Sequence, residues 1–140
     1  MQLRAIVFPA TIAEVEKPRQ VDATDSSNHP FRPGTMTVVT LANPREKFWG
    51  ILLALSTEGL TVCGIELASF EDLISMVKDG EPFTPGIVFF PMHRLERMEL
   101  DLPDGNIPSL SQRFTAKTSL DPSKVLSQRA AGIRSGEGAA

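Results

Sequence analysis

The side chains suited to catalysis are few in this sequence. His93 lies in the stretch VFFPMHRLERMEL (residues 88–100), and histidine is the residue type that most often acts as a general base. A catalytic imidazole also needs a partner that orients it, and no Ser, Cys or Asp stands at a recognisable spacing from His93. We therefore predict no catalytic residue and no enzymatic activity. A His93-dependent enzyme is the less favoured alternative.

The sequence also gives little support for a metal or a cofactor. Cys63 is the single cysteine, which excludes an internal disulfide, and its place in an apolar run favours a small buried side chain. Four carboxylates could bind a hard cation, but they alternate with arginines or follow the same strand, as on a solvated strand face: Glu96, Glu99, Asp101 and Asp104. No glycine-rich loop joins a strand to a helix. We expect no metal and no cofactor.

The best candidates for binding are aromatic and basic. Phe48 and Trp49 are consecutive in a strand, so one of them points inward and the other outward or under a covering element. An exposed ring could stack a base or hold a peptide, whereas a covered ring is part of the core. Basic residues and a histidine could complete the candidate surface: Arg45, Lys47, His93, Arg94 and Arg97.

These side chains must be positioned by a β-rich domain. Residues 35–41, 47–56 and 60–67 are rich in β-branched and apolar residues and are separated by short turns, which predicts a three-strand antiparallel meander. Gly50 and Gly64 lie inside the second and third strands. Glycine there indicates a sharp bend or bulge that lets the sheet curl into a barrel.

A helix is predicted after the meander, over about residues 69–79. Its apolar residues recur at helical spacing, Ser69 with Asp72 forms an acidic variant of the capping box, and Gly80 ends it. A short strand, IVFF, then leads to a tight helical turn over residues 91–94 and a last strand over residues 95–102. In that strand Met98 and Leu100 face inward, and three charged residues face water: Arg97, Glu99 and Asp101.

A short C-terminal helix is predicted over residues 109–119. Ser109 caps it, and Leu110 and Phe114, four residues apart, lie against the sheet. Beyond about residue 120 the chain offers little to bury. Residues 123–132 could form one or two frayed helical turns, and we expect a disordered tail over residues 120–140.

The strand pattern resembles the Sm-like family of small β-barrels. The resemblance covers residues 36–101 and rests on a few positions across the meander, followed by FFP..RLERM: Val38, Leu41, Asn43, Gly50, Leu52, Leu60 and Val62. It implies a five-stranded antiparallel barrel that forms rings through its edge strands. The chain has STEG (residues 56–59) where that family holds a base with aspartate and asparagine, so RNA binding at the usual site is in doubt.

These observations together predict an α+β protein, mainly β. A small five-stranded Sm-like barrel is expected over residues 35–119, with the inserted helix and the short C-terminal helix, after an edge strand and mobile loop in residues 1–34.

Residues 1–104 carry nine basic and fifteen acidic side chains, and the remainder of the chain has a net positive charge. The apolar run of residues 5–8 is too short for a signal peptide or membrane span, which favours a cytoplasmic protein.

The expected function is a non-enzymatic binding or adaptor module. Its partner is a protein or RNA, with no membrane, and the chain itself is a candidate homo-oligomer. An RNA-binding Sm-like protein is the alternative, which the basic tail would assist.

Overall fold

The computed structural model describes residues 29–134, of which residues 31–134 belong to one compact unit. The edge strand predicted near the N-terminus and the loop up to residue 28 lie outside the described residues.

Five antiparallel strands form a single sheet in the order β4-β3-β2-β1-β5. Their bounds are β1 Met36–Leu41, β2 Glu46–Leu55, β3 Gly59–Glu66, β4 Gly86–Pro91 and β5 Leu95–Leu100. The predicted meander is confirmed as β1, β2 and β3, and so are the two later strands. β4 and β5 are the outer strands and do not pair with each other, so the sheet is not closed.

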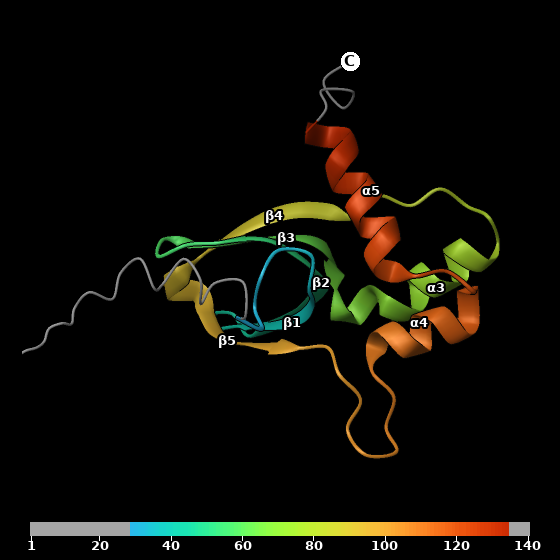
Figure 1. Cartoon of the computed structure of the whole chain (residues 1–140), viewed down its shortest axis with the longest axis horizontal. Helices are drawn as coiled ribbons and strands as arrows, with labels where there is room; N and C mark the ends of the chain where they lie inside the picture. The colour runs from blue at the N-terminus through green and yellow to red at the C-terminus, as the bar shows by residue number, and fades with distance from the viewer. Residues whose placement is uncertain (1–28, 135–140) are drawn as a thin grey trace, which may run out of the picture. The chain divides into compact units, whose positions relative to one another are not determined.

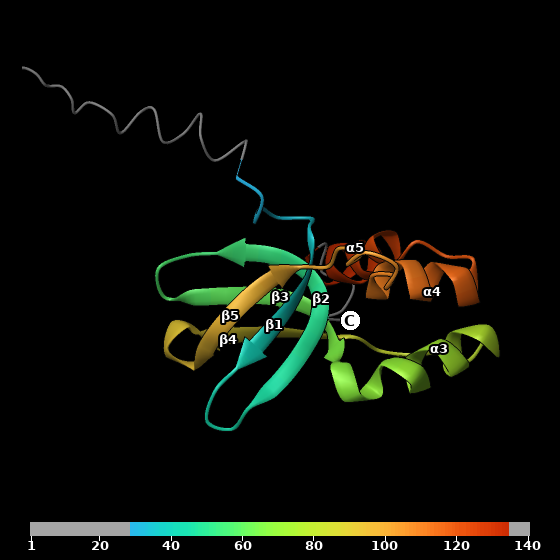
Figure 2. The same cartoon turned by 90° about the horizontal axis from the view of Figure 1, so that it is seen from below.

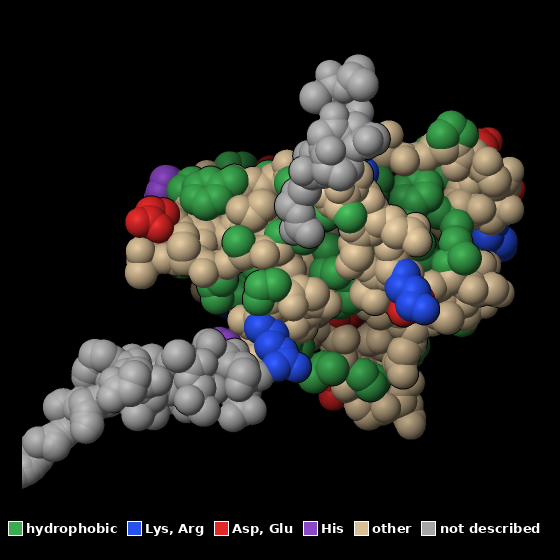
Figure 3. All heavy atoms as spheres, turned by 45° about the horizontal axis from the view of Figure 1, so that its top comes forward, with side chains coloured by type: hydrophobic (Ala, Val, Ile, Leu, Met, Phe, Trp, Pro, Cys, Tyr) green, Lys and Arg blue, Asp and Glu red, His purple; other side chains and the backbone are tan. Residues whose placement is uncertain are grey.

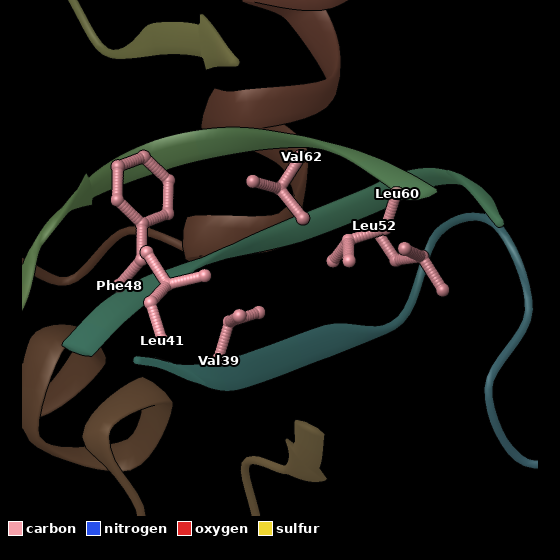
Figure 4. Close-up of a cluster of buried hydrophobic side chains, with 6 residues drawn as sticks. All are labelled: Val39, Leu41, Phe48, Leu52, Leu60 and Val62. Carbon is pink, nitrogen blue, oxygen red and sulfur yellow. The ribbon is translucent and has the colours of Figure 1, made fainter. Parts of the chain in front are cut away.

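The sheet curls around one of the three apolar clusters of the described residues. Buried side chains from β1, β2 and β3 point toward one another in Figure 4: Val39, Leu41, Phe48, Leu52, Leu60 and Val62. Side chains of β4 and β5 pack against the same cluster, among them Phe90 and Met98. The rings of Phe48 and Phe90 lie 5.3 Å apart although β3 separates their strands. Such a contact requires strong curvature.

Gly50 and Gly64 face each other in the register of β2 and β3. A Cβ atom on Gly50 would lie 2.4 Å from the Cys63 carbonyl oxygen, and one on Gly64 would lie 2.0 Å from that of Trp49. Only glycine permits this close approach of the two backbones. The register shift of β2 and β3 falls between Leu52 and Ala54, so neither glycine is the predicted bulge.

The α-helices of residues 29–134 pack at one end of the curled sheet (Figures 1 and 2). They are α3 Phe70–Lys78, α4 Leu110–Thr118 and α5 Pro122–Arg134, with a 3₁₀ turn, η2 Leu67–Ser69, before α3. Buried residues from α3 and α4 enclose Trp49: Phe70, Leu73, Ile74 and Phe114. The helices predicted over residues 69–79 and 109–119 are confirmed.

The predicted helix caps differ in their outcome. Ser109 and Gln112 form a reciprocal capping box, in which the Ser109 hydroxyl accepts from the Gln112 N–H at 3.0 Å and the Gln112 side chain accepts from the Ser109 N–H at 2.8 Å. Ser69 makes no side-chain cap, so the capping box predicted there is absent. Gly80 follows α3 with a φ of +74°, as a helix stop requires.

A 3₁₀ turn, η3 Met92–Arg94, joins β4 directly to β5. The tight turn predicted over residues 91–94 is therefore confirmed. Because the two strands it joins lie at opposite edges of the sheet, this corner spans the open side of the curl.

The prediction of a disordered tail from residue 120 is wrong for most of that segment. Residues 122–134 form α5, whose Leu126 and Ala130 are buried. Leu126 packs with Ile51 and Cys63 on the outer face of the sheet. Sequence reasoning missed this helix because its apolar residues are sparse and gain stability only from the sheet they cover.

Candidate functional site

The predicted aromatic surface is part of the core. Trp49 is 1% exposed and Phe48 is 7% exposed, on opposite faces of β2. Phe48 lies inside the curl, and Trp49 packs edge-on against Phe70 at a centroid distance of 5.0 Å. Neither ring can stack a base or hold a peptide, so the assignment of these two residues to a binding surface is wrong.

Asp101 fastens the end of β5 to the helices. Its carboxylate accepts hydrogen bonds from the indole N–H of Trp49 at 2.9 Å, the backbone N–H of Leu110 at 2.9 Å, and the N–H and hydroxyl of Ser111 at 2.7 and 2.6 Å. A negative charge at the N-terminal end of α4 also complements the helix dipole. Asp101 was expected to face water, and it instead joins three segments of the core.

The three arginines of the predicted surface are all engaged by glutamates. The pairs are Arg45 with Glu96 at 2.8 Å, Arg94 with Glu46 at 3.3 Å, and Arg97 with Glu99 at 2.6 Å. Arg94 also donates to the carbonyls of Ala42 and Pro44 in the loop between β1 and β2. It therefore holds that loop against the corner between β4 and β5. These pairings reduce the positive charge available to an anionic ligand.

The remaining predicted site residues do not form a reaction centre. Lys47 is exposed on β2, and His93 is exposed in η3. Within residues 29–134, no group of three or more His, Cys, Asp or Glu side chains could hold a metal ion. An open hollow of about 340 Å³ beside α3 is lined mainly by apolar side chains, with Asp72 as its ionisable group. This arrangement supplies no acid–base pair.

Cys63 is fully buried on β3 beneath α5. Burial raises the pKa of its thiol, and the charge of nearby Arg129 opposes this rise. A thiol with a raised pKa is a poor nucleophile at neutral pH. The structural role expected for Cys63 agrees with this position.

The most distinctive surface of the described chain is the free edge of β4. Ile87 is 37% exposed and Phe89 is 52% exposed, and both lie on the outer face of the sheet. Residues 82–92 contain no charged side chain. In the view of Figure 3, hydrophobic side chains reach the surface on both the strand side and the helix side of the domain. Natural edge strands usually carry charges that prevent pairing with other chains.

The register of β4 identifies its unpaired backbone groups. The Met92 N–H donates to the Glu58 carbonyl at 2.8 Å, and these two residues continue the register of β3 and β4. Hydrogen-bonded and non-hydrogen-bonded pairs alternate in an antiparallel ladder. The N–H and C=O groups of Ile87 and Phe89 therefore point away from β3, toward the free edge. Pro91 has the same phase but no N–H to offer.

The other edge of the sheet is protected. In β5 the same alternation directs the backbone groups of Met98 and Leu100 outward, because the Asp101 N–H donates to the Met36 carbonyl at 3.0 Å. A register shift lies at the start of this strand, and half of its six residues are charged: Glu96, Arg97 and Glu99. Bulges and charges are the usual means of blocking an edge strand.

Sequence reasoning missed Ile87 and Phe89 as candidate site residues. The signal that could have found them is the charge-free run of residues 82–92, with Pro85 and Pro91 on either side of the apolar strand. That run is equally consistent with a central strand, and only the strand order puts it at an edge.

Comparison with protein-family models, with curated proteins and with solved structures found no match. The structure contains no helix, within the described residues, that is long and apolar enough to cross a membrane.

Proposed function

We propose that this protein is a non-enzymatic interaction module that binds an extended protein segment along the free edge of β4. The observation that carries the proposal is the combination, in Ile87 and Phe89, of exposed apolar side chains with outward-facing N–H and C=O groups. Main-chain hydrogen bonds would give affinity, and the alternating apolar side chains would give selectivity.

The scaffold in this proposal is a small barrel of the Sm-like kind. Support comes from the five strands contributing to one inner cluster and from the η3 corner that joins the two outer strands. RNA binding has less support, because the three arginines of the predicted surface are each paired with a glutamate.

The test uses a displayed library of random peptides selected for binding to the full chain. We expect the selected peptides to have apolar residues at alternate positions and to slow amide exchange at Ile87 and Phe89. The Phe89→Lys variant should bind them at least about tenfold more weakly, since a charge replaces the largest apolar contact.

Leu102→Lys is the matched control, because Leu102 is also an exposed apolar residue, at 65%, but lies outside the sheet. It should leave the affinity unchanged. Peptides that bind Phe89→Lys as tightly as the parent, or that protect the loop around Leu102 instead, would contradict the proposal.

A further inference from the structure

The free edge of β4 is complementary to itself. Its sequence from Pro85 to Pro91 is PGIVFFP, with Val88 at the centre and a proline three residues away on each side. The outward-facing backbone groups belong to Ile87 and Phe89, which are placed symmetrically about Val88. An antiparallel strand centred on the same residue would therefore meet matching groups.

We propose that the segment bound at the free edge of β4 is β4 of a second copy of this chain. This inference rests on the proposed function, in which an extended strand pairs with that edge. A two-fold axis through Val88 places Ile87 of each copy opposite Phe89 of the other. Each such pair can exchange two hydrogen bonds, so all four outward-facing N–H and C=O pairs are satisfied.

The prolines suit this register. Pro91 of one copy would face Pro85 of the other, and since neither has an N–H, no donor is left without a partner by the pairing. The Pro85 carbonyl already accepts from Arg129 Nε at 3.2 Å. The paired window is thus limited to residues 87–89, which predicts a weak, concentration-dependent dimer rather than an extended fibre.

Charge favours β4 over β5 as the partner strand. Two β4 strands bring together two charge-free segments, and Ile87 meets an aromatic ring on the same face of the joint sheet. A β5 partner would instead bring the charged residues Arg97 and Glu99 into the paired segment, and its register shift would interrupt the ladder. The ring implied by the Sm-like resemblance would use that second arrangement.

Sedimentation velocity of the full chain, from micromolar to millimolar concentration, tests the inference together with a cysteine cross-link. Val88→Cys places a thiol opposite its own copy, within cross-strand reach, while Cys63 is buried. We expect a monomer–dimer equilibrium, a disulfide-linked dimer of Val88→Cys under mild oxidation, and a dissociation constant at least tenfold higher for Phe89→Lys. Glu99→Cys, on the opposite edge, should form no disulfide-linked dimer.

Three results would overturn the inference: a monomer throughout the concentration range, a species of three or more copies, or cross-linking of Val88→Cys no greater than that of Glu99→Cys. If library peptides still protect Ile87 and Phe89 in that case, strand addition stands and only the second copy is excluded. If neither peptide nor second copy protects these amides, the proposed function fails as well.

Discussion

The two edges of the sheet are built in opposite ways. β5 carries three charges in six residues, has a register shift, and continues into Asp101, whose carboxylate accepts four hydrogen bonds from Trp49 and the start of α4. β4 carries no charge, and one hydrogen bond, from Arg129 to Pro85, ties its start to α5. One edge is used to hold the fold together. The other leaves the N–H and C=O groups of Ile87 and Phe89 pointing away from the sheet.

The arginines of the predicted surface are likewise engaged in contacts within the domain. The three arginines lie where the loop between β1 and β2 meets η3 and β5, and their glutamate partners belong to β2 and β5. Arg94 in particular donates hydrogen bonds to the carbonyl groups of Ala42 and Pro44 in that loop. The charges on this side of the molecule serve internal contacts.

The largest effect is expected from Trp49→Ala, which removes the centre of the contact between β2, the helices and Asp101. A buried tryptophan replaced by alanine should lower the free energy of unfolding by about 3–5 kcal/mol. Urea denaturation followed by circular dichroism measures this. A loss below about 1 kcal/mol would show that Trp49 is not enclosed, and would return it to the list of surface candidates.

Asp101→Ala should lower the free energy of unfolding by about 2–3 kcal/mol, since the indole N–H and the first amides of α4 lose a charged acceptor. Asp104→Ala is the matched control, because this exposed residue is bridged to Ile107 through the backbone and should change stability by less than about 0.5 kcal/mol. If both substitutions lowered the free energy of unfolding equally, the hydrogen bonds of Asp101 would not be what anchors the β5 side of the sheet to the helices.

Pro91→Ala should strengthen the pairing of the β4 edge with another strand and should change the free energy of unfolding only slightly. The substitution adds an N–H that points away from β3, so the window for strand addition becomes longer. We expect several-fold tighter self-association in sedimentation velocity and faster aggregation on warming. Pro103→Ala, in the exposed loop after β5, should leave both unchanged. A Pro91→Ala variant that behaves like the parent would indicate that the edge is not in use.

The reactivity of the Cys63 thiol measures how well α5 covers β3, because Cys63 lies beneath α5 and opposite Ile87 of β4. Its raised pKa means that the folded state disfavours the thiolate, so this thiol stabilises the fold fully below its unfolded pKa. That contribution is lost as the pH rises toward the folded pKa. Alkylation by iodoacetamide should be slow in the native protein at pH 7–8 and fast in urea. Equally fast native labelling would mean that α5 does not cover β3.

The smallest effect is expected from Arg97→Ala. Its ion pair with Glu99 lies on the exposed face of β5, where such pairs contribute about 0–1 kcal/mol. Stability and peptide binding should both stay close to those of the parent. Loss of binding in this variant, with Phe89→Lys unaffected, would move the functional surface back to the basic corner.

The sequence was sufficient to locate most of the elements. The meander, the helices near residues 70 and 110, and the tight turn before β5 follow from local periodicity and capping residues, which act over a few neighbouring positions. Helix α5 could not be located in this way, since its few apolar residues, Leu126 among them, are stabilised by a sheet that is distant in sequence.

The amino-acid sequence by itself determined which segments become strands, which segments other than α5 become helices, and that residues 82–92 carry no charge. Tertiary structure alone decided that Phe48 and Trp49 are both covered, that Asp101 is an acceptor inside the fold, and that Ile87 and Phe89 lie at an open edge. Alternation says only that neighbouring side chains in a strand face opposite ways. Whether a face or an edge meets water depends on strand order and on the helices packed against it, and these are set by contacts between residues far apart in the chain.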